Sequence, residues 1–371
     1  MGIIKNILFL HSSSELYGSD RSLLNIIKQI DKSKFNCHVV LPCDGPLVHE
    51  LKAIRGVKVI IFEVAVLRRK NLSFFGFFNY VKDFFGSYAF LRRYIKRNSI
   101  DIVDTNTAVV FPGAVAARHL GKKNVWHMRE IIKSNFENSV ISFIMNRYAD
   151  AVVANSKATA RAIKVKRSKI RVVYNAVEVV KPAPTIPHDA PVIGMAGRIN
   201  RWKGQKLFVD AAEIVLKKYP QAVFRIAGDV YSGEEYIKED LIKYIGEKGL
   251  SDNIILLGQV DDMPSFYDGL DIFVLPSIQP EPFGLVVIEA MMHELPVVAT
   301  NHGGPTEIIT DGRNGFLVDY KNAREMAEKI LFLAENDSFR IDMGKAAAEN
   351  AVKKYSVPAM VRKIENIFNS V

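Results

Sequence analysis

Two glutamates with seven residues between them are the feature of this sequence with the clearest chemical meaning. They are Glu281 and Glu289, in the segment PEPFGLVVIEAM at 280–291. If the chain is helical from Phe283, the two carboxylates return to nearly one face, roughly 10 Å apart along the axis. Gly284 then lies in the first turn, where unpaired N–H groups and the helix dipole favour an anion. The pattern predicts a ligand with hydroxyls at both ends and negative charge between them, such as a nucleotide-sugar.

Further short motifs accompany the two glutamates in a fixed order. They are GRINRWKG at 197–204, AGD at 227–229, VLPS at 274–277 and GGPTE at 303–307. This ordered set resembles the retaining GT-B glycosyltransferases of family 4, which include many bacterial polysaccharide and glycolipid transferases. Two glutamates at this spacing alone are common on solvated helices, so the assignment depends on the whole set.

The resemblance implies a donor-binding site in the second half of the chain. Arg198 and Lys203 would hold the diphosphate, because a planar guanidinium can bind two oxygens while an ammonium supplies a point charge. A solvated basic loop is the alternative for this pair. Glu281 would face the donor sugar, and Glu289 would bind the ribose hydroxyls. The remaining expected contacts are made by the backbone, at Phe283, Gly284 and Leu285 to the distal phosphate and near Gly258 and Val260 to the base.

The family also uses a glycine turn after its first strand, and Gly18 matches it. Ser19 stands where many relatives have a second glycine, so the approach of the backbone to a phosphate is in doubt there. Capping of the following helix by Ser19 or Asp20 is the alternative interpretation.

Polar residues close several strands of the first half. His127 matches a histidine often found near the donor sugar in this family, although a buried structural histidine is the alternative. Asp104 and Asn106 end another strand and are expected at the acceptor hydroxyl, with a strand-terminal turn as the alternative. Arg129 is expected to contact the acceptor or to pair with Glu130. Other residues that end strands on this side are Asn155, Ser156 and Asn175.

Charge is distributed unevenly along the 371 residues. The net charge is +10, but residues 1–180 contain 29 Lys and Arg against 13 Asp and Glu, whereas the remainder contains 21 against 27. The basic half predicts an anionic partner, either a membrane surface or a phosphate-bearing acceptor, and no nucleic-acid motif accompanies it. No metal is predicted, because no Asp-x-Asp closes a strand, and Asp261-Asp262 is interpreted as a turn or helix cap.

An aromatic and basic segment at 67–97 is the candidate membrane contact within that half. Its sequence crowds phenylalanines beside lysines and arginines, as interfacial segments among lipid headgroups do. Packing of its phenylalanines on the protein's own sheet is the alternative. The chain contains no run of about 20 uncharged apolar residues. With only Cys37 and Cys43 present and no signal peptide identified, the predicted location is the cytoplasm, with peripheral contact at the inner face of the membrane.

Short apolar runs that alternate with amphipathic stretches predict an α/β chain with parallel sheets. The expected strands are Asn6–His11, Cys37–Leu41, Val57–Phe62, Ile100–Thr105, Val125–Met128, Ala151–Ala154, Ile170–Tyr174, Val192–Ala196, Phe224–Ala227, Ile254–Leu257, Ile272–Leu275, Val297–Ala299 and Phe316–Val318. Four prolines within 181–191 predict a linker. The expected architecture is GT-B, two doubly wound Rossmann-like domains facing across a cleft. One is an acceptor-side domain at 1–180, and the other is a donor domain at 181–356. By resemblance, a helix at 357–371 returns to the first domain.

The resemblance implies a retaining, metal-independent hexosyltransferase with no cofactor. Its donor would be a UDP- or GDP-sugar and its acceptor a glycan or lipid-linked hydroxyl, as in cell-surface polysaccharide synthesis. The expected catalytic residues are Glu281, His127, Arg198 and Lys203. Two alternatives remain open: a nucleotide-sugar 2-epimerase of the same architecture, and a non-catalytic nucleotide-sugar sensor or membrane-docked scaffold.

Overall fold

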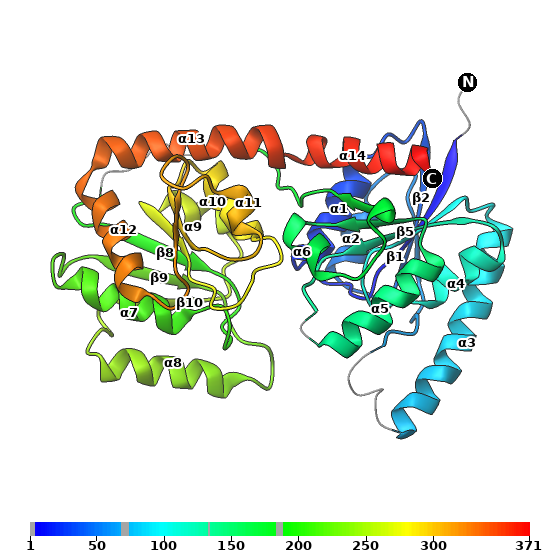
Figure 1. Ribbon diagram of the computed structural model, residues 1–371, viewed down its shortest axis with the longest axis horizontal. Coiled ribbons are helices and arrows are strands. Elements are labelled where there is room, and N and C mark those ends of the chain that lie inside the picture. The colour runs from blue at the N-terminus through cyan, green and yellow to red at the C-terminus, as the bar shows by residue number, and fades with distance from the viewer. Residues whose placement is uncertain (1–3, 68–73, 133, 183–187) are drawn as a thin grey trace. The chain divides into compact units, whose positions relative to one another are not determined.

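A computed structural model of the chain describes residues 4–67, 74–132, 134–182 and 188–371 (Figure 1). The chain forms two compact units. One comprises Met1–Ala176 and Val357–Val371, and the other comprises Val177–Ser356. The observed crossing lies four residues before the expected boundary at 180. Part of the expected linker, residues 183–187, lies outside the described residues.

The N-terminal unit is built on one parallel seven-stranded sheet with strand order β3-β2-β1-β4-β5-β6-β7. Its elements are β1 (Lys5–Leu10), α1 (Gly18–Gln29), β2 (Phe35–Leu41), α2 (Pro46–Lys52), β3 (Lys58–Ile61), α3 (Phe74–Arg97), β4 (Ile102–Thr105), α4 (Pro112–His119), β5 (Lys123–Met128), α5 (Asn135–Tyr148), β6 (Ala151–Ala154), α6 (Lys157–Ala162), the 3-10 turn η2 (Arg167–Lys169), β7 (Ile170–Val172) and α14 (Val357–Ser370).

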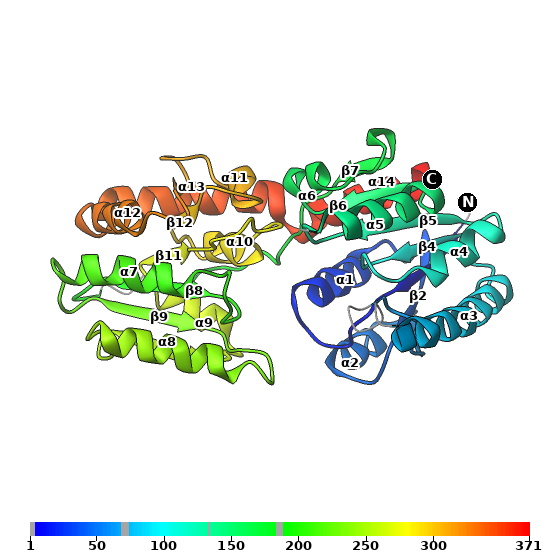
Figure 2. The same cartoon turned by 60° about the horizontal axis from the view of Figure 1, so that its bottom comes forward.

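Helices cover both faces of this sheet, which is why its strands read as continuous apolar runs. Alternate residues of β1 point to opposite faces. Ile7 and Phe9 pack with α1, α2 and α14, whereas Leu8 and Leu10 pack with α3 and α4. Figure 2 shows the helices on either side of the strands.

The C-terminal unit is built on a parallel six-stranded sheet with strand order β10-β9-β8-β11-β12-β13. Its elements are β8 (Val192–Ala196), α7 (Gln205–Leu216), β9 (Val223–Ala227), α8 (Glu235–Glu247), β10 (Ile254–Gly258), α9 (Met263–Asp268), β11 (Ile272–Leu275), α10 (Leu285–Met292), β12 (Val297–Thr300), α11 (Pro305–Ile308), β13 (Phe316–Val318), α12 (Ala323–Glu335) and α13 (Asp337–Tyr355). The α/β fold class with two doubly wound parallel sheets is confirmed, and each expected strand is present within two residues of its predicted bounds.

Strand order reverses direction once in each sheet, between β1 and β4 and between β8 and β11. Loops that leave two such neighbouring strands diverge to opposite faces, so a crevice opens at the carboxyl ends of the strands. Polar residues that follow β1, β4, β8 and β11 are therefore the first candidates for a site in each unit.

The C-terminal helix α14 completes the N-terminal unit, as the resemblance implied. Its apolar face packs in the core shared by α1, β1 and β2. Phe368 is fully buried there, and its ring meets Phe9 edge-on at 6.1 Å and Phe35 at 5.9 Å between centroids. The last residues of the chain therefore stabilise its first strands.

Truncation of Phe368 tests this dependence. Phe368→Ala should lower the free energy of unfolding of the N-terminal unit by about 3–5 kcal/mol, because it removes a fully buried ring and leaves a cavity. Urea denaturation followed by fluorescence of Trp126, in a Trp202→Phe background, measures it. Asn369→Ala is the matched control, since Asn369 is exposed on the same turn. Equal loss of stability in the two variants would contradict the proposed role of α14.

Candidate functional site

The predicted donor-site residues of the C-terminal unit gather at its switch point. Arg198 and Lys203 lie in the loop between β8 and α7, and Glu281 lies between β11 and α10. Because β8 and β11 are neighbours in the sheet, these two loops start side by side at the carboxyl ends of their strands. Lys203 and Glu281, which are 78 residues apart in the sequence, are thereby brought into contact.

The position of Glu281 is fixed by a pair of glycines and not by a helix. Its backbone forms a parallel bridge with Gly303, and its carbonyl oxygen accepts a hydrogen bond from Gly304 N at 2.7 Å. Gly303 has φ of +74°, and a Cβ there would lie 2.2 Å from the Glu281 carbonyl oxygen. Only glycine allows this approach. The GGPTE motif therefore holds the first glutamate in place.

The helical expectation for residues 283–291 is partly wrong. Helix α10 begins at Leu285, and Gly284 is its N-cap in the left-handed region with φ of +97°. Gly284 therefore stands before the first turn, and Phe283 is buried outside the helix. Glu281 lies before the helix, so helical periodicity does not relate it to Glu289. The N–H groups of the first turn still open toward the segment that contains Glu281.

Lys203 and Glu281 form an ion pair that is largely withdrawn from water. The distance from Lys203 Nζ to Glu281 Oε2 is 2.8 Å, and the side chains are 14% and 11% exposed. Ser277 Oγ donates to the same carboxylate oxygen at 3.2 Å. Ser277 is held in turn by its carbonyl oxygen, which accepts from Thr300 Oγ1 and His302 Nε2. A charge pair with this support has a defined geometry before any ligand arrives.

Aromatic rings support both cations of the loop. The Arg198 guanidinium carbon lies 3.3 Å from the centroid of the Tyr231 ring, and Lys203 Nζ lies 4.5 Å from that of Trp202. The turn between them is closed by Asn200, whose side-chain oxygen accepts from the backbone N–H groups of Trp202 and Lys203. Two positive charges are thus held at the carboxyl end of the sheet, where an anion with several oxygens can bridge them.

The remaining donor-side predictions are placed around this centre. Glu289 lies on α10 and accepts a hydrogen bond from the buried Tyr267 hydroxyl at 2.8 Å. Gly258 ends β10, where its carbonyl oxygen accepts from Gly228 N at 2.7 Å, and Val260 follows in the next loop. Glu289 thus lies on a helix, whereas Gly258 and Val260 lie at and just after the carboxyl end of β10. The binding roles of all three stay predictions.

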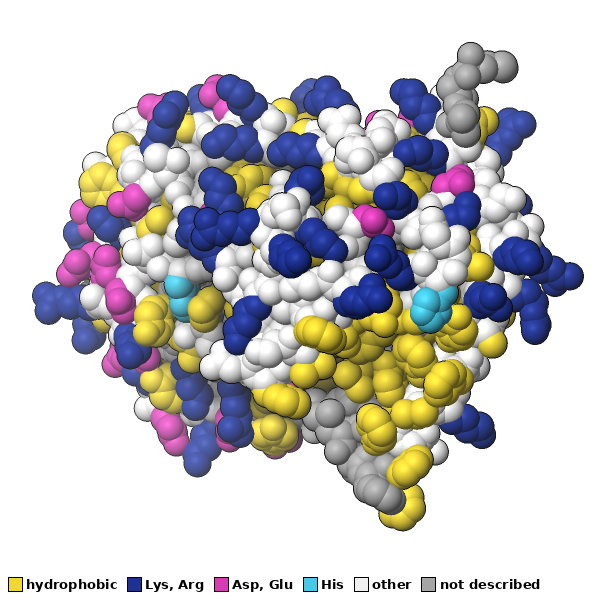
Figure 3. All heavy atoms as spheres, turned by 45° about the vertical axis from the view of Figure 1, so that its right-hand side comes forward, with side chains coloured by type: hydrophobic (Ala, Val, Ile, Leu, Met, Phe, Trp, Pro, Cys, Tyr) yellow, Lys and Arg dark blue, Asp and Glu magenta, His cyan; other side chains and the backbone are white. Residues whose placement is uncertain are grey.

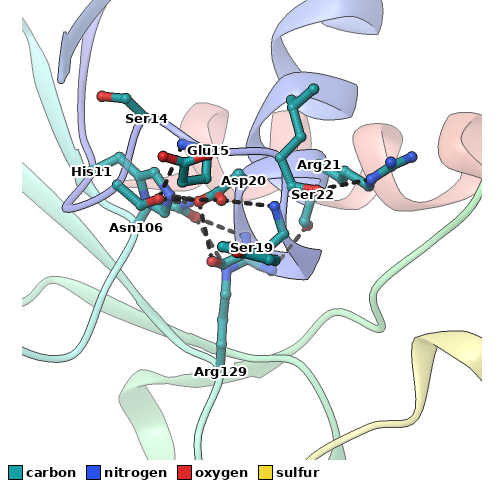
Figure 4. A network of polar contacts seen from close by, with 12 residues as sticks. His11, Ser14, Glu15, Ser19, Asp20, Arg21, Ser22, Asn106 and Arg129 are labelled. Carbon is teal, nitrogen blue, oxygen red and sulfur yellow. Dashed lines mark hydrogen bonds and ion pairs between the residues drawn. The ribbon is translucent and has the colours of Figure 1, made fainter. Parts of the chain in front are cut away.

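In the N-terminal unit one buried network joins the predicted residues Asp104, Asn106, His127, Arg129 and Asn175. Figure 4 shows the part of it around Arg129 and Asn106. Arg129 stands at its centre. Its guanidinium donates to Asn106 Oδ1 at 2.7 Å, to Asn175 Oδ1 at 2.7 Å and to Ser22 Oγ at 2.9 Å. These partners are neutral, and burial lowers the pKa of Arg129 to about 10 although the charges of Asp104 and Asp20 oppose the shift.

Two Asp–His pairs flank the arginine. His127 donates from Nε2 to Asp104 at 2.8 Å and accepts from Arg129 at 3.4 Å. His11 donates from Nε2 to Asp20 and accepts from Asn106 at 3.2 Å. Asp104 thus compensates the arginine charge through His127, and Asp20 does so through His11 and Asn106, with each imidazole carrying its proton on Nε2.

Burial limits what these residues can reach. Asp104 and Asn106 are each 1% exposed and His127 is 2% exposed, because the ends of β1, β4 and β5 direct them toward one another. Asp104 and Asn106 bond side chains that follow or end neighbouring strands. Their acceptor role stays a prediction. Catalytic and acceptor roles for His127 and Arg129 stay predictions.

The interpretation of the residues after Gly18 as a helix cap is confirmed in part. Gly18 opens α1, and Tyr17 occupies the N-cap position. Asp20 lies inside the first turn and accepts a hydrogen bond from Tyr17 N at 2.9 Å. Neither Ser19 nor Asp20 is the N-cap residue, but the Asp20 side chain completes a capping box from the third position of the helix. The same carboxylate also bonds His11.

Several residues at the two centres escaped the sequence analysis. In the C-terminal unit they are Tyr231, Ser277 and His302, and in the N-terminal unit His11 and Ser22. Ser277 belongs to the VLPS motif, and His11 ends the first expected strand. The positions of both in the sequence could therefore have marked them as candidates. Within the described residues, no group of three or more His, Cys, Asp or Glu is placed to hold a metal ion.

Two protein families match the chain. The family described as Glycosyl transferases group 1 matches residues 177–350, and Glycosyltransferase Family 4 matches residues 17–181. The two matches meet where the chain crosses between the two structural units.

Curated relatives are similar over part of their length. The poly(ribitol-phosphate) alpha-N-acetylglucosaminyltransferase of Staphylococcus aureus (strain COL) is 35% identical over 191 residues, which cover 49% of this chain and 38% of the relative. The D-inositol 3-phosphate glycosyltransferase of Paenarthrobacter aurescens (strain TC1) is 37% identical over 167 residues, which cover 44% of this chain and 40% of the relative. Matched segments thus span less than half of these relatives.

Solved structures are similar over about three quarters of the chain or more. Anabaena HepE, in complex with UDP and glucose, superposes with a TM-score of 0.83 at 25% identity and covers 98% of this chain and 99% of its own. S. aureus TarM, in a complex that contains UDP, gives a TM-score of 0.66 at 26% identity and covers 76% and 59%.

The Lys203–Glu281 pair makes a measurable prediction about stability. Lys203→Met leaves a largely buried carboxylate without its cation and should lower the free energy of unfolding by about 2 kcal/mol. Adding Glu281→Gln should recover part of the loss, since the two substitutions are coupled. Thermal unfolding of both single variants and the double variant measures the coupling.

Lys238→Met is the control, because its pair with Asp229 is about one third exposed and exposed pairs contribute about 0–1 kcal/mol. Additive effects of Lys203→Met and Glu281→Gln would show that the two charges do not interact.

Proposed function

We propose that this chain, which belongs to the family 4 glycosyltransferases of the GT-B type, moves a hexose from a nucleoside diphosphate sugar to a hydroxyl acceptor. The glycosyltransferase assignment follows from the two family matches and the GT-B fold. The donor, the stereochemistry and the acceptor are the proposed parts.

The proposal rests on the contact of Lys203, in the loop after β8, with Glu281, in the loop after β11. The two loops meet at the point where the strand order reverses. Arg198 and Lys203 supply two positive charges, and α10 adds the N–H groups of its first turn. These cations and N–H groups together suit a diphosphate, which carries several negatively charged oxygens. Glu281 stands 2.8 Å from Lys203, so it would meet the sugar that the diphosphate carries.

A uridine donor is our first choice of nucleotide. HepE holds UDP and glucose, and HepE in a further crystal structure holds UDP-glucose. Backbone contacts at Gly258 and Val260 would distinguish one base from another only weakly, which leaves GDP-sugars as the second choice. Glu289, fixed by Tyr267, would accept hydrogen bonds from the ribose hydroxyls.

The proposed chemistry is transfer with retention and without a metal. The bond from the sugar C1 to the diphosphate oxygen breaks, and the acceptor oxygen attacks from the face the diphosphate leaves. The departing oxygen takes the acceptor proton. Arg198, Lys203 and the α10 N-terminus would stabilise the charge that develops on the diphosphate.

The proposed acceptor is a glycan or a lipid-linked sugar in cell-surface polysaccharide synthesis. The relatives include a capsular polysaccharide biosynthesis glycosyltransferase, CapM, of S. aureus. The basic N-terminal unit suits an anionic acceptor or an anionic membrane surface at the cytoplasmic face. Among the helices the structure describes, none is both long and apolar enough to cross a bilayer.

Truncation of Glu281 or of Lys203 tests the proposed function. Glu281→Ala and Lys203→Ala should each lower turnover at least about tenfold, because charge developing in the transition state loses a partner. The assay follows UDP release and sugar transfer, and NMR of the product reports the anomeric configuration. Lys217→Ala, on the exposed end of α7, is the control.

A folded Glu281→Ala, Lys203→Ala double variant that still transfers sugar at the parent rate would contradict this assignment. Donor binding without transfer to any acceptor would favour the sensor or scaffold alternative. Interconversion of the donor sugar at C2 would favour the epimerase.

A further inference from the structure

Helix α5 presents an exposed aromatic face. Phe136 and Phe143 are 77% and 71% exposed, and they stand seven residues apart with Val140 between them, on one side of the helix. Arg147 continues the same side. The opposite side, with Ile141 and Met145, is buried in the protein's own core. Packing within the unit therefore explains the inner face of α5 but not the outer one.

Helix α3 repeats the arrangement. Phe78 and Phe85 are also seven residues apart and are 59% and 64% exposed, and Phe77 beside them is 56% exposed. Tyr80 and Phe84, on the inner side, join the cluster that contains Ile141 and Met145. The two helices thus share one inner cluster and expose their aromatic faces from the same region. The interpretation of 67–97 as packing on the protein's own core is confirmed for some of its aromatic residues, whereas others are exposed. Membrane contact by this segment stays a prediction, and residues 68–73 lie outside the described residues.

These exposed rings gather on one side of the N-terminal unit. Figure 3 shows hydrophobic side chains spread over the region of α3 and α5, with lysines and arginines around them. We call Phe77, Phe78, Phe85, Phe136 and Phe143 the aromatic surface. A contiguous apolar area of this kind on a polar protein marks an interaction site.

A basic segment borders the aromatic surface. Residues 157–171 contain seven Lys and Arg and no Asp or Glu. Hydrogen bonds hold this segment along α5: Lys164 Nζ donates to Ser139 Oγ at 2.9 Å, and Lys169 Nζ donates to Asn146 O at 2.8 Å. Ser139 adjoins Val140, so the positive charges begin at the edge of the exposed rings.

Helix α3 supplies further positive charge, part of it beside the exposed rings and part at the distant C-terminal end of the helix. It contains five Lys and Arg against one acidic residue, Asp83. Lys82 lies between Phe78 and Phe85 on the exposed side, and Arg92, Arg93, Lys96 and Arg97 form the C-terminal end of the helix.

We propose that the aromatic surface and the basic segment 157–171 together form a docking surface for an anionic lipid membrane. The rings would enter the headgroup region while the lysines and arginines contact lipid phosphates. A second copy of this chain is a poor occupant, because a symmetric contact would bring two basic segments against each other. The inference rests on the proposed function, since a membrane-docked enzyme can reach a lipid-linked acceptor.

Sedimentation of the full chain with vesicles tests the proposal. Vesicles of phosphatidylglycerol and phosphatidylcholine should bind the chain, vesicles of phosphatidylcholine alone should bind it at least about tenfold more weakly, and salt should weaken binding to the first kind. Phe85→Ser with Phe143→Ser, and separately Lys164→Glu with Arg167→Glu, should each reduce binding about tenfold.

Matched controls lie on the other unit. Ile242→Ser changes an apolar residue of α8 that is 52% exposed, and Lys217→Glu with Lys345→Glu reverses two exposed charges. Both should bind vesicles like the parent. Transfer to a soluble acceptor should be unchanged in all of these variants, so loss of vesicle binding with intact transfer separates this proposal from the proposed function.

Equal binding of all variants to anionic vesicles would overturn the assignment of the surface. Absence of vesicle binding, with light scattering showing a dimer that Phe85→Ser and Phe143→Ser dissociate, would overturn it in favour of an interface between copies.

Discussion

The contact between Lys203 and Glu281 is the constraint on which the C-terminal site depends. It joins the loops that leave β8 and β11, the two strands between which the order of the sheet reverses. Separating an ion pair that is shielded from water would leave a buried charge without a partner, which costs free energy. The two loops are therefore held in one geometry. Ser277 donates to the carboxylate, the Gly303-Gly304 turn holds the backbone of Glu281, and Trp202 lies against the ammonium. Arg198 and the start of α10 then stand in fixed places around the pair.

The sequence predicted the layered architecture well, because strands covered on both faces leave continuous apolar runs between the longer amphipathic segments. It misplaced the start of α10 for a physical reason. Gly284 adopts a left-handed conformation that ends the preceding turn, and Glu281 is held by Gly303, which lies in a later loop of the chain. Local periodicity carries no information on such a contact. The aromatic face of α5 was missed for the same reason, since Phe136 and Phe143 become informative only once α3 lies beside them.

The two units use charge differently. In the N-terminal unit Arg129 is buried among Asn106, Asn175 and Ser22. Asp104 is linked to it through His127, and Asp20 is linked to it through His11 and Asn106. A buried charge with these partners fixes the carboxyl ends of β1, β4 and β5 relative to α1 and makes this end of the sheet rigid. The sequence singled out Arg129, Asn106 and Asn175 separately, but the register of neighbouring strands was needed to show that they contact one another. In the C-terminal unit the charges lie in loops at the carboxyl ends of β8 and β11. A ligand can replace their present contacts there.

Calorimetric titration of UDP into the parent chain and into Lys203→Met tests the central claim most directly, since it needs neither acceptor nor turnover. The account predicts that UDP binds the parent and that Lys203→Met weakens binding at least about tenfold, the loss of roughly one charge-assisted contact to phosphate. Equal affinity of the two proteins for UDP would contradict the claim that Lys203, at the carboxyl ends of β8 and β11, binds a diphosphate.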